Sequence, residues 1–230
     1  MRVAFPAWNT DKYNWDRVAA ALKPLSAVCD LEVFSYGPLP EADWCRFTRI
    51  NPPSDLLSLY DMARDAVQVV TALDDFDLLY CWSGGAYFQV FCSLIAQVAG
   101  KPMVMHVNGD GALSRKHHCR PMDRVLQDAV DRLSLNDVDL LVPISSVLKQ
   151  AVEARVKHGR VSEPVPFCVD AEHYKPLPFP EEFCIGYAGR VSPEKGFPFF
   201  TKVMESAASR KFRLAGVLQM AMQFPENAHY

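Results

Sequence analysis

Near the C-terminal end of the chain, two cations and several small residues follow a short apolar run. The segment is Ile185–Gly196, with the sequence IGYAGRVSPEKG. The apolar run predicts a strand, the small residues predict a turn, and we expect a helix from about Phe197. Backbone N–H groups at such a junction attract anions. Arg190 could form two parallel hydrogen bonds to phosphate oxygens, and Lys195 could add a compact charge. The pattern therefore predicts a diphosphate site built from Gly189, Arg190 and Lys195, although exposed cations around a turn are the plain alternative.

A second polar group follows an apolar run in the first half of the chain. Asn108, Gly109 and Asp110 come directly after Pro102–Val107. Ligands on parallel sheets bind beyond the carboxyl ends of the strands. Asn108 and Asp110 are therefore the candidate catalytic residues, although Asp110 could merely make a side-chain turn. His106, within the apolar run, fits a core histidine with satisfied hydrogen bonds as well as it fits a site residue.

Short apolar runs alternate with amphipathic stretches along the chain, a pattern typical of alternating strands and helices. The predicted strands are Arg2–Ala7, Cys29–Tyr36, Asp77–Trp82, Pro102–Val107, Asp139–Ile144 and Lys211–Val217. The predicted helices are Trp15–Lys23 (ended by Pro24), Asp55–Leu73 (with Ser54 as N-cap), Tyr87–Ala99, Met122–Leu135, Ser146–Val156 (with Ser146 as N-cap) and Phe197–Ala208. This alternation predicts an α/β fold, with a Rossmann-like, mostly parallel sheet and helices on both of its faces.

A proline-rich segment divides the predicted elements into two groups. Five prolines fall between Pro164 and Glu182, where little periodicity is visible. We expect a first Rossmann-like domain over residues 1–165, a connector over 166–182, and the incomplete start of a second Rossmann-like domain over 183–230. Only one strand–helix–strand piece is expected in the last part, so that its sheet would expose an edge.

Composition excludes several classes of protein. Among 230 residues, half are hydrophobic and 22% are charged, and the net charge of −3 comes with no basic run that could track a nucleic acid. The seven cysteines are widely spaced and form no C-x-x-C pair, which argues against a disulfide framework or a zinc clip. His117-His118 has no suitably spaced partner, so no metal site is expected. The first residues lack the apolar core of a signal peptide, and no window predicts a membrane span. We expect a cytoplasmic protein; peripheral contact with a membrane stays open.

Three segments together resemble the retaining GT-B glycosyltransferases of family four. Gly189–Gly196 is similar to the family's G-R-x-x-x-E-K-G signature. Asp139–Lys149 resembles its strand–serine–helix segment, and Val165–Pro176 resembles its connector between the two domains. The chain departs from the family at Phe167-Cys168, where Asn-Gly is usual, and at Asn108, which aligns with a common histidine. Asn108-Gly109-Asp110 is closer to an Arg-Gly-Asp version of that segment.

The resemblance implies a reaction and a set of roles. The donor would be a nucleotide-diphosphate sugar, the acceptor a glycan, lipid or small molecule, and no cofactor or metal would be needed. Arg190 and Lys195 would neutralise the departing diphosphate. The Asn108–Asp110 loop would face the acceptor and the transferred sugar. Further acceptor-side positions would lie in the loops after the first and third predicted strands: Asn9, Asn14, Trp15, Gly84 and Gly85. Trp15 could stack on a sugar or simply anchor its loop, and the two glycines could serve only a tight turn.

The resemblance also predicts that the donor domain is truncated. The family's later glutamate pair, which holds donor ribose and sugar, would lie beyond Tyr230, so we expect this chain alone to be inactive. Two other interpretations remain. One is a GT-B-shaped sugar-nucleotide epimerase, and the other is a non-catalytic remnant that keeps the first domain as a binding module.

Overall fold

The computed structural model describes residues 1–7, 12–35, 42–50, 59–73, 75–83, 86–109, 121–168, 171, 175, 178, 183–207, 209–216 and 228–229. The chain divides into two compact units, Met1–His173 and Tyr174–Tyr230, called unit 1 and unit 2 below. Each unit has its own sheet and its own hydrophobic core.

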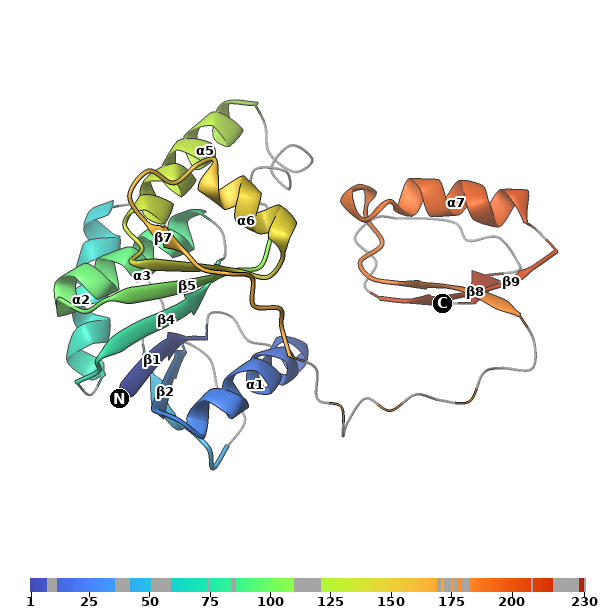
Figure 1. Cartoon of the computed structure of the whole chain (residues 1–230). Coiled ribbons are helices and arrows are strands. Elements are labelled where there is room, and N and C mark those ends of the chain that lie inside the picture. The colour runs from blue at the N-terminus through green and yellow to red at the C-terminus, as the bar shows by residue number, and fades with distance from the viewer. Residues whose placement is uncertain are drawn as a thin grey trace. The chain divides into compact units, whose positions relative to one another are not determined.

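The core of unit 1 is a seven-stranded sheet with the order β3-β2-β1-β4-β5-β6-β7 (Figure 1). Its strands are β1 (Arg2–Pro6), β2 (Asp30–Ser35), β3 (Arg46–Arg49), β4 (Leu78–Trp82), β5 (Met103–Val107), β6 (Leu140–Pro143) and β7 (Arg160–Val161). Every neighbouring pair is parallel. The parallel, Rossmann-like sheet predicted from the alternating pattern is therefore confirmed.

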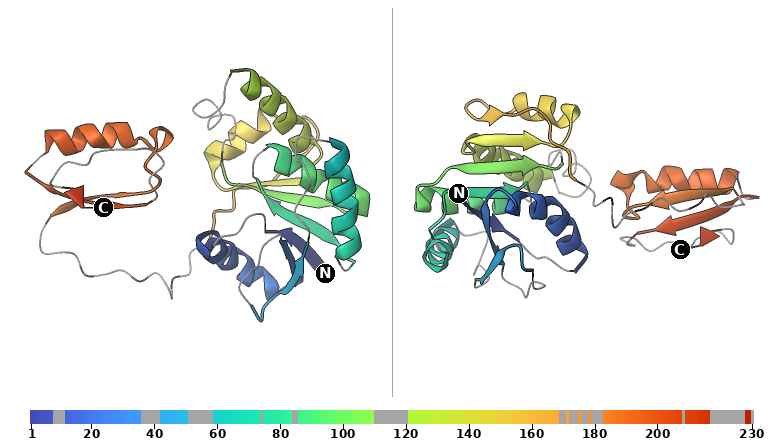
Figure 2. Two further views of the ribbon diagram at one scale, coloured as in Figure 1. Left: turned by 180° about the vertical axis from the view of Figure 1, so that it is seen from behind. Right: turned by 60° about the horizontal axis from the view of Figure 1, so that its bottom comes forward.

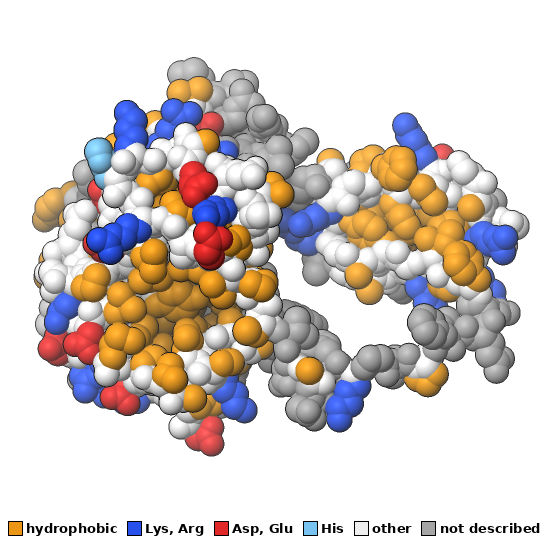
Figure 3. Space-filling view, viewed as in Figure 1, with side chains coloured by type: hydrophobic (Ala, Val, Ile, Leu, Met, Phe, Trp, Pro, Cys, Tyr) orange, Lys and Arg blue, Asp and Glu red, His pale blue; other side chains and the backbone are white. Residues whose placement is uncertain are grey.

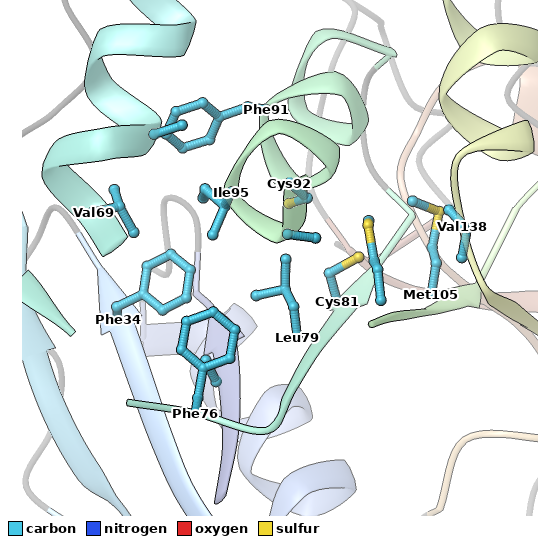
Figure 4. Packing of buried hydrophobic residues seen from close by; sticks show 14 of the residues in the cluster. Phe34, Val69, Phe76, Leu79, Cys81, Phe91, Cys92, Ile95, Met105 and Val138 are labelled. Atoms are coloured by element: carbon cyan, nitrogen blue, oxygen red, sulfur yellow. The ribbon is translucent and has the colours of Figure 1, made fainter. Parts of the chain in front are cut away.

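Helices cover both faces of this sheet (Figures 1 and 2). They are α1 (Lys12–Ser26), α2 (Leu59–Ala72), α3 (Ala86–Ala99), α5 (Pro121–Asn136) and α6 (Ser146–Glu153). Alternate strand residues point to opposite faces, so Phe34 joins a cluster with α2, α3 and α5 while its neighbour Val33 joins a cluster with α1. Figure 4 shows the first cluster, in which Leu79 from β4 lies near Ile95 of α3, and Met105 from β5 lies near Val138.

On the α1 side, aligned residues of three neighbouring strands form two rows across the sheet. One row is Tyr80, Val104 and Leu140, and the other is Trp82, His106 and Val142. Figure 3 shows hydrophobic side chains gathered over β4 and β5 on the face of unit 1 turned to the viewer. His106 is a buried polar residue between Trp82 and Val142 in its row, and its hydrogen bonds must be accounted for.

Unit 2 holds a three-stranded parallel sheet with the order β10-β9-β8. Its elements are β8 (Cys184–Ala188), a 3₁₀ turn η1 (Pro193–Lys195), α7 (Phe197–Ser206), β9 (Lys211–Ala215) and β10 (Ala228–His229). Phe212 and Leu214 alternate with exposed residues along β9, and pack with Phe197 and Met204 of α7. The expectation that unit 2 holds only a strand–helix–strand piece was wrong, because β10 pairs with β9. Part of the β9 edge, which we expected to be open, is therefore paired.

Three other predictions about single elements need correction. Helix α1 continues through Pro24 to Ser26, because a proline in the last turn removes only its own N–H bond and Leu25 beyond it still packs in the α1 cluster. The N-cap of α6 is Ser145, not Ser146: Ser145 has extended backbone angles, and its Oγ accepts a hydrogen bond from the Leu148 N–H at 3.3 Å. The last predicted strand ends at Ala215, because Gly216 adopts a φ of 157°. Ser54 lies outside the described residues.

Strand β3 and the short strand β7 were not predicted, and both lie at the edges of the sheet. Among the described residues, no helix has the length and apolar character to cross a membrane. The six cysteines that the structure describes are free thiols.

Candidate functional site

The predicted diphosphate loop, Gly189–Gly196, begins where β8 ends, at the carboxyl edge of the unit 2 sheet. Gly189 has a φ of 146°, and its N–H donates to the carbonyl of Ala215 at 2.9 Å. The 3₁₀ turn Pro193–Lys195 follows and ends at Gly196, whose φ of 71° turns the chain into α7. Each of these glycines adopts a conformation that other residues rarely accept. The local sequence therefore folds as a strand, a turn and a helix, as predicted.

The backbone of this loop offers fewer free donors than the sequence suggested. Besides Gly189, the N–H groups of Lys195 and Gly196 are used internally, donating to the carbonyls of Ser192 at 3.2 Å and Pro193 at 3.0 Å. The side chains of Arg190 and Lys195 are exposed. The attraction for an anion must therefore come mainly from these two side-chain charges, and less from the backbone.

Gly216, which the sequence analysis did not single out, touches the same loop. It follows β9, the neighbour of β8, and its φ is 157°. A Cβ atom at this position would overlap the carbonyl oxygen of Gly189. The two glycines thus allow the two strand ends to approach closely. Gly216 lies within the predicted strand Lys211–Val217, and a glycine near the end of a predicted strand was the signal that could have identified this contact.

In unit 1, Ser83 and Asn108 are paired at the carboxyl ends of β4 and β5. The Asn108 backbone N–H donates to Ser83 Oγ at 3.0 Å, and Ser83 Oγ donates to Asn108 Oδ1 at 2.8 Å. Because the serine proton is used on Oδ1, the Asn108 amide is oriented with Nδ2 away from Ser83. Among the described residues, no group accepts a hydrogen bond from Asn108 Nδ2. Asn108 therefore presents an oriented, half-buried donor at the edge where ligands bind parallel sheets.

His106, just before this pair, belongs to a directed chain of hydrogen bonds. Its Nε2 lies 2.7 Å from the Val165 carbonyl oxygen, and its Nδ1 lies 2.9 Å from the Tyr80 hydroxyl. A carbonyl can only accept, so Nε2 carries a proton; burial of the ring lowers the pKa of His106 and favours the neutral form, in which Nδ1 accepts from Tyr80. The Trp82 Nε1–H donates to the Tyr80 hydroxyl oxygen at 3.3 Å. His106 is therefore neutral, and both of its ring nitrogens are satisfied.

The burial of His106 and Tyr80 supports the assignment of His106 as neutral. His106 is 5% exposed, and desolvation lowers its pKa, although the hydrogen bond to Val165 opposes this shift. Burial also raises the pKa of Tyr80 to about 12, so its hydroxyl keeps the proton that it donates. Of the two interpretations that the sequence left open, the satisfied core histidine is the one that the geometry supports.

Phe167, in the segment that follows β7, packs against two rings of this hydrogen-bond chain. Its ring centroid lies 4.7 Å from that of Trp82 and 4.8 Å from that of His106. Together with the Val165 carbonyl, it fastens this segment to β4 and β5. Phe167 belongs to the Phe167-Cys168 departure noted in the sequence, and its packing against these two rings gives that departure a physical reason.

The other predicted acceptor-side residues have mixed outcomes. Trp15 lies in α1, in agreement with the predicted helix Trp15–Lys23: it is 5% exposed, stacks on Trp44 at 5.9 Å between ring centroids, and belongs to the core. Its position in α1 follows from the apolar stripe that it shares with Val18 and Leu22. Asn14 is also in α1, and its side chain is outside the description. Gly109 is exposed, and a Cβ atom there would meet nothing within 4 Å. The remaining positions lie outside the described residues: Asn9, Gly84, Gly85 and Asp110.

Within the described ranges, no three His, Cys, Asp or Glu residues are grouped so that they could hold a metal ion. Sequence reasoning missed Ser83 and Gly216 in the two sites. Ser83 directly follows the predicted strand Asp77–Trp82, whereas Gly216 follows the observed strand β9 but lies within the predicted strand Lys211–Val217.

Known structures share this fold. A sucrose-phosphate synthase from Thermosynechococcus elongatus matches 93% of this chain with a TM-score of 0.69 and 13% identity. Anabaena HepE, solved with UDP and glucose, matches 95% with a TM-score of 0.68 and 16% identity. A glycosyltransferase from Rickettsia africae matches 94% with a TM-score of 0.61 and 10% identity. A scan against protein-family models and a search of curated proteins each found no match.

The chain therefore has the fold of GT-B glycosyltransferases. It spans about 60% of the length of these structures, with 62%, 61% and 60% of each covered. At such low identity the similarity establishes the fold. The reaction must be inferred from the residues of the two sites.

Proposed function

We propose that this chain forms the acceptor-side domain and the first part of the donor-side domain of a retaining GT-B glycosyltransferase. The observation that carries the proposal is the Gly189–Gly196 loop, which holds two exposed cations at the carboxyl edge of a parallel sheet. HepE, with a similar fold, was solved with UDP and glucose and also with UDP-glucose. A nucleotide-diphosphate sugar is therefore the proposed donor.

The proposed step is sugar transfer. The bond between the anomeric carbon and the diphosphate oxygen breaks, the acceptor hydroxyl oxygen bonds to that carbon on the same face, and its proton leaves with the diphosphate. Arg190 and Lys195 stabilise the negative charge that develops on the leaving group. Asn108, oriented by Ser83, donates from Nδ2 to a hydroxyl of the sugar or acceptor. No cofactor or metal ion is required by this scheme.

The proposed acceptor is a glycan, lipid or small molecule, and a nucleic acid is not expected. The proposed compartment is the cytoplasm, because the described cysteines are free thiols that are typical of a reducing environment. Asp110 keeps its proposed place beside Asn108 in the acceptor-side loop.

Turnover with a panel of nucleotide sugars tests the proposal in the complete protein that carries this chain. Arg190→Ala and Lys195→Ala should each lower kcat/KM by roughly tenfold to a hundredfold, because each removes a charge-assisted contact to the leaving group. Lys202→Ala is the matched control, since Lys202 is an exposed lysine of α7 outside the loop. Full activity of both loop variants would contradict the phosphate assignment. Isomerisation of the sugar nucleotide without transfer would favour an epimerase instead.

A further inference from the structure

A single hydroxyl group lies beneath the diphosphate loop. Tyr187, in β8, donates from Oη to the Arg190 carbonyl at 2.7 Å, and the same oxygen is 3.4 Å from the Lys195 carbonyl. A Cβ atom built on Gly189 would lie 3.8 Å from this oxygen. The carbonyls of Arg190 and Lys195 therefore both approach this one oxygen atom, and Gly189 lies beside it.

The ring of Tyr187 is held firmly enough to act as an anchor. It packs edge to face on Phe197, with 5.0 Å between ring centroids and an interplanar angle of 81°. It also lies 5.1 Å from the ring of Phe200. Both phenylalanines belong to α7, and Phe197 is fully buried. The ring is thus fixed by the strand below and the helix beside it, while the hydroxyl reaches the loop.

We propose that Tyr187 is a positioning residue of the diphosphate site. Its hydroxyl ties Arg190 to Lys195 through their carbonyls, so that the two side-chain charges can act on one ligand. The argument rests on the proposed function of the loop. It predicts that a phenylalanine, which keeps the ring packing and removes only the hydroxyl, weakens diphosphate binding without unfolding unit 2.

The test is calorimetric titration of the 230-residue chain with inorganic pyrophosphate and with UDP. Tyr187→Phe should weaken pyrophosphate binding by roughly threefold to tenfold, the effect of losing one hydrogen bond. Ser206→Ala is the matched control, because its Oγ donates to the Lys202 carbonyl at 2.7 Å within α7, away from the loop. Thermal unfolding of both variants should remain close to that of the unaltered chain.

A double-mutant cycle separates positioning from a general structural effect. If Tyr187 acts through the placement of Arg190, Tyr187→Phe should change pyrophosphate affinity by less than roughly twofold once Arg190→Ala is present. Equal losses in both backgrounds, or no loss in either, would overturn the positioning role while the phosphate assignment survived. Failure of the unaltered chain to bind either ligand would overturn the phosphate assignment and the positioning role with it.

Discussion

Replacing Tyr80 with phenylalanine tests whether the His106 hydrogen-bond chain stabilises unit 1. The change removes the donor to His106 Nδ1 at 2.9 Å and the acceptor of the Trp82 indole N–H at 3.3 Å. His106 is 5% exposed, so its acceptor nitrogen would lose its partner in a site that water barely reaches. A buried acceptor without a partner costs about 1–3 kcal/mol, and the longer indole contact adds about 0.5 kcal/mol. The free energy of unfolding of unit 1 should therefore fall by about 1.5–3.5 kcal/mol.

Urea unfolding followed by tryptophan fluorescence measures this loss selectively. All four tryptophans, at positions 8, 15, 44 and 82, lie within the bounds of unit 1. Tyr60→Phe is the matched control, because Tyr60 is 76% exposed on α2, and it should change stability by less than about 0.5 kcal/mol. If Tyr80→Phe unfolded at the same urea concentration as Tyr60→Phe, the hydrogen-bond chain would make no net contribution and the reasoning would be refuted.

Three further predictions concern single residues. Burial lowers the pKa of His106, so the unfolded chain takes up a proton at a higher pH than the folded chain, and the free energy of unfolding should fall as the pH drops below about 6.5. His106→Gln should make the free energy of unfolding, measured in urea titrations, depend less steeply on pH. An unchanged pH dependence would contradict the assignment of His106 as a buried, neutral histidine. Gly216→Ala should increase amide hydrogen exchange across β8 and β9, because its Cβ would overlap the Gly189 carbonyl, whereas Gly109→Ala should leave exchange in unit 1 unaltered. Ser145→Ala should cost unit 1 about 1 kcal/mol through loss of the α6 cap, and a larger cost for Ser146→Ala would restore the original N-cap prediction.

Much of the fold could be predicted because buried parallel strands are short, continuous apolar runs. The residues of β4 and β5, LLYCW and MVMHV, are of this kind. The residues of β3, RFTR, are not, because an edge strand pairs on one side only and tolerates charge at both ends. The cap of α6 was misplaced for a different reason: two adjacent serines are chemically equivalent candidates, and only the extended backbone at Ser145 distinguishes them.

The candidate sites were predictable only in part. The position of Gly189, Arg190 and Lys195 follows from the order of strand, turn and helix, which is a local pattern. The Ser83–Asn108 pair depends instead on β4 and β5 being neighbours, because these residues are 25 positions apart in the sequence. The role of Tyr187 was hidden for a similar reason, since a tyrosine in a strand resembles any other core aromatic until its hydroxyl partner is known.

Two roles were left open for Trp15 by the sequence, stacking on a sugar or apolar anchoring. In the structure Trp15 packs against Trp44 and Phe47, with ring centroids 5.9 Å and 5.4 Å away, which agrees with the anchoring role. An aromatic side chain that can bury most of its area in a core usually does so. Among the described residues, the proposed acceptor side therefore rests on Asn108, whose amide is oriented by Ser83.

The most direct test of the central claim is a crystal structure of the protein with UDP bound. The proposed function predicts that oxygens of the diphosphate lie within hydrogen-bonding distance of the Arg190 guanidinium and the Lys195 ammonium groups, next to Gly189 at the end of β8. A diphosphate bound elsewhere, with neither cation in contact, would contradict the claim that this loop holds the leaving group.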